Sequence, residues 1–366
     1  MIDRLKTVTS SPKFSKFKHH WLTLAFILGF VVDNLTLNRV DQLFDNLVLL
    51  AYVLIAMGSI IYLYAGIASK MPESWVPYSR KYAPLLIQYA FGGLLSGMLI
   101  FYGRSGSWSE SWPFLLLILG VIYGNETIKD RSSRLIFNLA IFFVGLFSYV
   151  VLVIPVVTGH MGPWIFVGSG LLALIIMQGF IRVLRWIVPN FINLHLKSIV
   201  FTVGCIFAGL NFLYFTNIIP PIPLSLKEVG IYHSVVRFDN GDYQVSYEKG
   251  PWWRFWKQSD TVFHPTAGGN IYCFAKVFAP TRLSTDIYHS WDYYDEEKEE
   301  WVQHLRLSYP ISGGRSSGYR GYTFIENFRE GEWRCSVETE RGQVLGQEKF
   351  TVDYSGQVGE LETRVE

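Results

Sequence analysis

Ionisable residues occur within a stretch of the sequence that is otherwise apolar, VVDNLTLNRVDQLFDNLVLL (31–50). Ionisable groups at membrane depth are costly and often functional. One hypothesis is therefore a polar site on the outer face of a helix bundle, formed by Asp33, Arg39, Asp45 and Arg104. The alternative, which we favour for this stretch, is a solvated hairpin in which an aspartate pairs with an arginine.

A glycine-rich stretch, SGGRSSGYRGYTF (312–324), contains residues that suit anions. Its glycines permit tight turns, and the guanidinium groups of Arg315 and Arg320 are forked donors for carboxylate or phosphate. Tyr319 lies between them. These three residues are candidate ligand-binding residues. The alternative, which we favour for this stretch, is a bulged hairpin whose arginines pair with the acidic loop 295–300.

An aromatic stretch, SYEKGPWWRFWKQSD (246–260), holds Trp252, Trp253 and Trp256 among basic residues. Exposed tryptophans stack on sugars or enter the membrane interface, and basic neighbours attract anionic lipid. These tryptophans join the predicted ligand-binding residues, although a role in filling a protein core explains them equally well.

Patterns for catalysis and metal binding are missing from the sequence. It has no CxxC, and we find no paired carboxylates, no GxSxG and no Cys/His pair in a context that argues for catalysis. The positions of its histidines, among them His233, His264, His289 and His304, give no ligand spacing. We expect no cofactor, no metal and no enzyme activity. Cys273 and Cys335 lie on the apolar sides of two expected strands, where a disulfide and two separate thiols both fit, and separate thiols are favoured.

Seven apolar segments are long enough, or nearly so, to cross a bilayer, which takes about 20 residues. Basic residues gather in alternate connections, with 14 of the 16 in residues 1–220 on one side, so that side is predicted to be cytoplasmic. The amino terminus is then inside, as a retained anchor, and the carboxy terminus outside. The predicted spans are 21–38, 46–68, 83–103, 111–124, 135–157, 163–184 and 198–217.

A second domain follows a linker with three prolines, NIIPPIPL (217–224). Residues 1–220 carry a net charge of +8 and residues 221–366 one of −6, which indicates two environments. After the linker, apolar and polar residues alternate with the period of strands, as in 271–278 and 333–339. We predict a seven-helix membrane bundle in residues 1–220, followed in 221–366 by an antiparallel β-sandwich of about eight strands, immunoglobulin-like.

Several phrases of the chain resemble the bacterial domain-of-unknown-function family 2914. They are LSLKEVGIYHSVVR, VFAPTRLSTDIYHSW, SGGRSSGYRGYTF and GEWRCSVETERGQVLGQEKFTV in the second domain, with VDNLTLNRVDQLFDN and FYGRSGSWSESWPF in the first. The resemblance implies a bacterial inner-membrane protein with a multi-span bundle and a small all-β domain. It implies no activity.

The sequence therefore favours a non-enzymatic, multi-pass inner-membrane protein whose periplasmic β-sandwich binds an envelope glycan, a lipid head group or a protein partner. The alternative is a transporter or membrane-embedded enzyme of envelope metabolism with an outward-facing polar site. The lipid bilayer is an expected partner. Nucleic acid is not, because the second domain is acidic.

Overall fold

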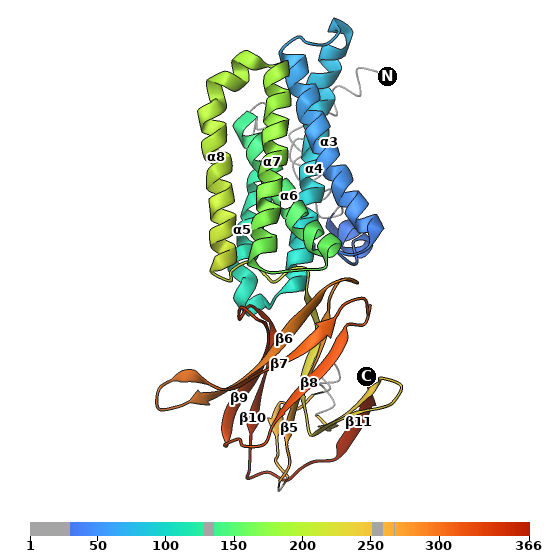
Figure 1. Cartoon of the computed structure of the whole chain (residues 1–366), viewed down its shortest axis with the longest axis vertical. Helices are drawn as coiled ribbons and strands as arrows, with labels where there is room; N and C mark the ends of the chain where they lie inside the picture. Colours follow the sequence, from blue (N-terminus) through green and yellow to red (C-terminus); the bar gives the residue numbers. More distant parts are fainter. Residues whose placement is uncertain (1–29, 128–134, 251–258, 267) are drawn as a thin grey trace, which may run out of the picture. The chain divides into compact units, whose positions relative to one another are not determined.

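The computed structural model describes residues 30–127, 135–250, 259–266 and 268–366. Its first half is helical, because long apolar runs can satisfy their backbone hydrogen bonds within each helix. Residues 30–36 are helical, and a short 3₁₀ turn, η1 (Glu73–Trp75), precedes the second long helix. The longer helices lie side by side in Figure 1: α3 (Leu43–Ile67), α4 (Val76–Ser105), α5 (Trp108–Thr127), α6 (Leu135–Thr158), α7 (Pro163–Ile187) and α8 (Pro189–Phe215).

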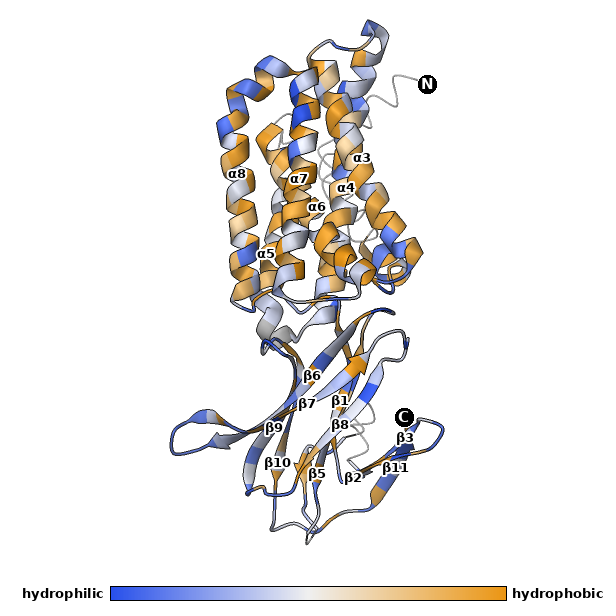
Figure 2. Cartoon of the chain, in the orientation of Figure 1, coloured by the Kyte–Doolittle hydropathy of each residue, from blue (hydrophilic) through white to orange (hydrophobic). Residues whose placement is uncertain are grey.

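Five helical stretches are long and apolar enough to cross a membrane: Leu43–Ile67, Glu73–Ser105, Leu135–Thr158, Pro163–Ile187 and Pro189–Phe215. Apolar residues dominate these helices in Figure 2. The predicted count of seven is not met within the described residues. The fourth predicted span is a shorter apolar stretch, Ser111–Gly124 in α5. Half of the first, 21–38, lies outside the described part of the chain.

The chain separates into two compact units. One consists of Met1–Ile100, Leu117–Val153 and Gly168–Gly209; the other consists of Phe101–Leu116, Ile154–Val167 and Leu210–Glu366. The second unit thus contains helix ends as well as every described strand. The division into residues 1–220 and 221–366 remains a prediction.

The described residues of the second unit include eleven strands, which form three sheets. The first sheet has the order β1 (Ser225–Tyr232), β5 (Ile271–Phe278), β8 (Tyr319–Ile325). The second has the order β4 (Val262–Phe263), β10 (Val344–Val352), β9 (Gly331–Thr339), β6 (Ser284–Asp295), β7 (Glu300–Ser312). The third has the order β11 (Leu361–Val365), β3 (Tyr243–Glu248), β2 (Ser234–Arg237). Described strand pairs are antiparallel except β4 with β10, which is parallel.

The first and second sheets share one core, because the apolar faces of their strands meet. Ile271 and Cys273 of β5 are completely buried, and they cluster with Trp291 of β6 and Trp333 of β9. The alternation that predicted strands at 271–278 and 333–339 is thus confirmed as a buried face of each strand. The acidic stretch after β6 forms the tip of the hairpin between β6 and β7. Asp286 and Asp292 lie within β6.

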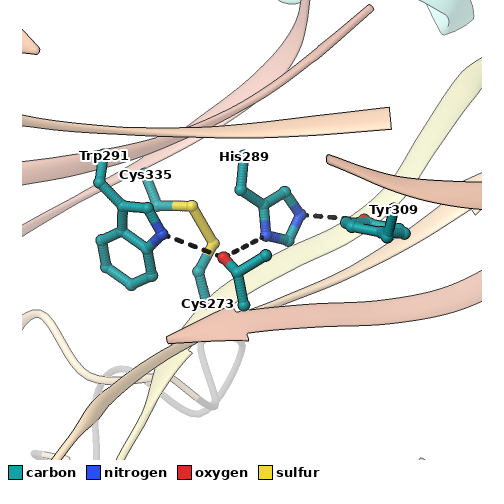
Figure 3. The surroundings of a disulfide bond; sticks show 6 residues. Cys273, His289, Trp291, Tyr309 and Cys335 are labelled. Carbon is teal, nitrogen blue, oxygen red and sulfur yellow. Dashed lines mark hydrogen bonds between the residues drawn. A yellow bond between two sulfur atoms is a disulfide. The ribbon is translucent and has the colours of Figure 1, made fainter. Parts of the chain in front are cut away.

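A disulfide joins these two sheets. Cys273 of β5 and Cys335 of β9 are bonded, so the favoured interpretation of two separate thiols is wrong for this structure. Alternation showed that each sulfur faces a core, but it could not show that the two strands face each other. Beside the disulfide runs a buried chain of hydrogen bonds through the side chains of Trp291, Thr323, His289 and Tyr309 (Figure 3).

Candidate functional site: a carboxylate between two histidines

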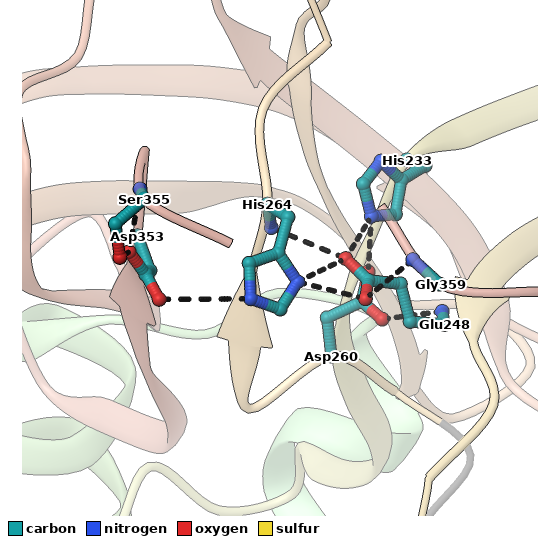
Figure 4. Close-up of polar contacts among 7 residues, drawn as sticks. All are labelled: His233, Glu248, Asp260, His264, Asp353, Ser355 and Gly359. Atoms are coloured by element: carbon teal, nitrogen blue, oxygen red, sulfur yellow. Dashed lines mark hydrogen bonds and ion pairs between the residues drawn. The ribbon is translucent and has the colours of Figure 1, made fainter. Parts of the chain in front are cut away.

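The Glu248 carboxylate lies between two imidazole rings from different parts of the chain (Figure 4). His233, between β1 and β2, bonds Glu248 Oε1 through Nε2 at 3.0 Å. His264, just after β4, bonds Glu248 Oε2 through Nδ1 at 2.8 Å. A carboxylate accepts hydrogen bonds only, so each of these ring nitrogens carries a proton and donates it.

Two backbone amides complete the environment of Glu248. The amide of His264 donates to Oε1 at 3.1 Å, and the amide of Gly359, just before β11, donates to Oε2 at 3.2 Å. Glu248 ends β3 of the third sheet, whereas His264 follows β4 of the second sheet. The carboxylate therefore ties the third sheet to the second.

Asp260 lies behind this carboxylate and is only 2% exposed. Its Oδ1 accepts the amide hydrogen of Glu248 at 2.7 Å. Its Oδ2 is 3.6 Å from Nε2 of His233 and has no hydrogen-bond partner in the described part of the chain. On the other side of the group, Asp353 Oδ2 is 3.7 Å from His264 Nε2. We call these five residues the two-histidine cluster: His233, Glu248, Asp260, His264 and Asp353.

Burial determines how the two-histidine cluster holds protons. Removal from water raises the pKa of Asp260 to about 8, and it lowers the pKa of His233 against the opposing attraction of Glu248. Burial also acts to raise the pKa of Glu248, but the hydrogen bonds from His264, Gly359 and His233 outweigh it and leave that pKa below its usual value. At pH 7 we therefore expect an ionised Glu248, a neutral His233 and a protonated Asp260. Because Oδ1 of Asp260 accepts an amide hydrogen, its proton lies on Oδ2.

This arrangement can bind and release protons near neutral pH. It does so at a junction between two sheets, next to the hydrogen bonds of Glu248 that tie the third sheet to the second. Glu248 and Asp260 also flank the stretch 251–258 that carries the predicted tryptophans, and the bond from the Glu248 amide to Asp260 Oδ1 joins the two flanks.

A second group of residues has metal-binding side-chain types. Among the described residues, three ligand atoms of Cys, His, Asp or Glu lie within 4.8 Å of one another at Cys273, His289 and Cys335. The two sulfurs are bonded to each other, so neither is a free thiolate. Burial also lowers the pKa of His289 to about 3, which keeps its ring neutral.

The predicted ligand-binding residues of the glycine-rich stretch are only partly brought together. Arg320 of β8 pairs with Asp242 at 3.1 Å, not with the acidic loop 295–300 that the alternative interpretation gave it. The Arg315 guanidinium lies over the ring of Tyr319, 5.8 Å from its centre. The predicted tryptophans Trp252, Trp253 and Trp256 lie outside the described residues.

The predicted outer-face polar residues lie at the start of the helical half. Asp45 Oδ2 accepts the backbone amides of Asn38 and Arg39 at 2.8 and 2.9 Å, and the Arg39 side chain pairs with Asp41 at 2.7 Å. Asp33 Oδ1 accepts a hydrogen bond from the Tyr52 hydroxyl at 3.5 Å. The aspartate–arginine pair of the favoured hairpin is present as Arg39 with Asp41, but Asp45, which holds the turn, is buried and not solvated. Arg104, in the last turn of α4, belongs to the other compact unit.

Sequence reasoning missed the two-histidine cluster. Its members come from separate strands and loops, and strand pairing brings them together over long sequence distances. Local spacing therefore carried no signal. The one usable hint was polar residue type at the ends of apolar, alternating segments.

Comparison with known proteins identifies one family. Residues 284–352 match the model of a family described as a protein of unknown function (DUF2914). The match begins with β6 and ends with β10. No curated protein matches the chain.

Two solved structures show only weak similarity. One is an immunoglobulin-like protein from Pseudomonas aeruginosa, with 13% identity over 30% of this chain and 96% of that one, at a TM-score of 0.19. The other is the alkylpurine DNA glycosylase AlkC of Pseudomonas fluorescens bound to DNA containing an abasic site analog, with 9% identity over 86% and 99%, at a TM-score of 0.23. Neither likeness carries an argument about this chain. The family match is more informative: the segment from β6 to β10 matches the DUF2914 family model.

Proposed function

We propose that this chain is a multi-pass inner-membrane protein that presents an immunoglobulin-like β-sandwich to the periplasm. The sandwich binds an envelope glycan, a lipid head group or a protein partner, and the chain catalyses no reaction. The helical half anchors it in the lipid bilayer, with the amino terminus in the cytoplasm. Five helices of sufficient length and apolarity support the membrane location.

The observation that carries this proposal is the Cys273–Cys335 disulfide. Disulfides persist outside the cytoplasm, where glutathione and thioredoxin do not reduce them. The basic residues of the helical half supply an independent argument. Most of them lie in connections on one side of the membrane, predicted to be cytoplasmic, and the β part is then on the other side. Both arguments support the proposed periplasmic location of the second unit.

The proposed ligand site combines the glycine-rich and aromatic stretches. Tyr319 and Arg320 of β8, with Arg315 in the loop before it, supply anion-binding and stacking groups. The stretch with Trp252, Trp253 and Trp256 is flanked by Glu248 and Asp260 of the two-histidine cluster. Because Glu248 and Asp260 hold those flanks, we expect ligand binding to depend on pH.

Fusions of an alkaline phosphatase that needs disulfides for activity test the location. A fusion after Glu366 should be active, and one after Lys70 should be inactive. The reverse pattern would place the β part in the cytoplasm and remove the proposal.

Ligand binding is tested on the full chain in detergent, at pH 5.5 and pH 7.5. Peptidoglycan fragments, anionic lipid head groups and envelope glycans are screened by their shift of the melting temperature, since a ligand specific for the native state raises it. Arg320→Ala should remove the shift, while Arg237→Ala, a change of another exposed arginine of the β part, should leave it. If Asp33→Ala loses function while Arg320→Ala keeps normal function, the transporter alternative is favoured instead.

A further inference from the structure

A groove between α7 and α8 combines an apolar floor with a basic end. Its volume is about 770 Å³, and α7 lines it with one stripe of residues at helical spacing: Leu171, Ile175, Gln178, Arg182 and Arg185. The facing residues of α8 include Val200 and Gly204. All of these lie in one compact unit.

The basic end of the groove lies at the level of a membrane interface. Trp164 and Trp186 of α7 are 89% and 84% exposed, and tryptophans of this kind mark the two interfaces of a bilayer. They are 22 residues apart, which is about 33 Å along a helix and close to the thickness of a hydrocarbon core of about 30 Å. Arg182 and Arg185 precede Trp186 by four residues and by one residue, within about 6 Å of its level along the helix, and are exposed.

The charged side chains of α7 and α8 are all basic. α7 and α8 contain no aspartate or glutamate, whereas Arg182, Arg185 and Lys197 lie near their shared turn. Beyond Arg182 the stripe continues for about 16 Å, through Gln178 and Ile175 to Leu171, which is close to the depth of one leaflet, about 15 Å. A basic pocket between helices that continues as an apolar groove fits a molecule with an anionic head and an apolar chain.

We propose that the groove between α7 and α8 binds one anionic phospholipid of the adjacent leaflet. Its phosphate lies against Arg182 and Arg185, and one acyl chain lies along Ile175, Val200 and Gly204. The proposal rests on the membrane location and not on the ligand role of the β part, so the phosphatase fusions and the lipid experiment can fail separately.

Native mass spectrometry of the full chain in detergent tests the site, with dioleoyl phosphatidylglycerol and dioleoyl phosphatidylcholine as probes. We expect one phosphatidylglycerol to bind at least tenfold more tightly than phosphatidylcholine. Arg182→Gln with Arg185→Gln should weaken it about 25-fold, since each basic residue near an anionic head group contributes about fivefold. The matched control is Arg80→Gln with Lys81→Gln, an exposed basic pair on α4, which should change affinity less than twofold.

A second variant tests the acyl chain without altering charge. A side chain at Gly204 would enter open space in the groove, so Gly204→Phe should block binding. Gly209, also on α8, does not line the groove, and a side chain there would also meet no nearby atom. Gly209→Phe should therefore bind the lipid normally. Equal affinity of the wild-type chain for both lipids overturns the proposal, and that comparison needs no variant. The proposal is also overturned if the Arg80 and Lys81 control loses as much phosphatidylglycerol affinity as the Arg182 and Arg185 variant, or if Gly204→Phe binds the lipid normally.

Discussion

At the scale of single residues, Asp260 determines how the β part should respond to pH. Its pKa is raised from 3.8 to about 8 by burial, so between these values the folded chain holds a proton that the unfolded chain has lost. Stability therefore falls as pH rises through this window. His233 acts in the opposite sense but only below its ordinary pKa of 6.5, and Glu248 acts only below 4.5. Between pH 6.5 and pH 8, Asp260 alone among these three groups contributes.

Asp260→Asn should remove the loss of stability above neutral pH. The wild-type β part should lose about 2 kcal/mol between pH 6.5 and pH 8 from this group, since each pKa unit corresponds to about 1.4 kcal/mol. Asparagine keeps the acceptor for the Glu248 amide but cannot ionise. Melting temperatures of the full chain across this range measure the effect, with Asp239→Asn, an exposed change, as the control. A wild-type melting temperature that rises from pH 6.5 to pH 8 would contradict the assignment.

Thr323 is the junction of the buried hydrogen-bond chain beside the disulfide. Its hydroxyl accepts the Trp291 Nε1 hydrogen at 3.0 Å and bonds His289 Nδ1 at 3.0 Å. Thr323→Val keeps the shape of the side chain but leaves both ring groups without a partner in the core. We expect a loss of about 2–4 kcal/mol, since each unsatisfied buried group costs about 1–3 kcal/mol. Denaturant unfolding measures this, and Thr351→Val on the exposed side of β10 should change stability by no more than about 0.5 kcal/mol.

At the scale of elements, a loop contact explains one glycine of the stretch 312–318. The loop after β7 returns against the loop after β5, where the Gly313 amide donates to Leu283 O at 2.8 Å and the Gly314 amide to Ala279 O at 3.2 Å. A Cβ on Gly313 would lie 1.7 Å from the backbone oxygen of Pro280. Only glycine permits this approach.

Gly313→Ala should therefore separate the two loops and cost about 3 kcal/mol, the upper range for a forced steric insertion. Alanine at Gly250, an exposed glycine with no atom near an added Cβ, is the matched control and should be close to neutral. The comparison is made by chemical unfolding of both variants. Equal stability of Gly313→Ala and wild type would show that the loops do not meet as closely as described.

Elements with a long, regular pattern were predictable from the sequence, and elements defined by partners were not. β5 and β9 were visible because alternate residues, such as Cys273 and Val337, must face a core. β2, β4 and β11 are two to five residues long, too short for a period to appear, which is why about eight strands were expected and eleven are described. The two-histidine cluster depends on which strands pair, and residue spacing carries no information about that.

At the scale of the whole molecule, the two units differ in the interactions that stabilise them. The helical half is apolar and rich in basic residues, whereas the second unit is acidic and gains a covalent link between two sheets. That link matters more for a small β part than for a large core, because burial increases with domain size. The redox state of Cys273 and Cys335 therefore connects the compartment of the protein to its stability.

Reduction should destabilise the β part by about 4 kcal/mol, because the disulfide closes a loop of 62 residues and restricts the unfolded chain accordingly. The full chain is isolated from a host that oxidises exported proteins, denatured, and treated with a thiol alkylating agent before and after reduction. One cysteine, the free Cys205, should react before reduction and all three after it. Cys273→Ala with Cys335→Ala should reproduce the lowered melting temperature of the reduced chain, while Cys205→Ser should melt as the wild type does. Three reactive thiols before reduction would mean that the sulfurs are separate in the native protein, and the periplasmic assignment would then depend on the basic residues of the helical half alone.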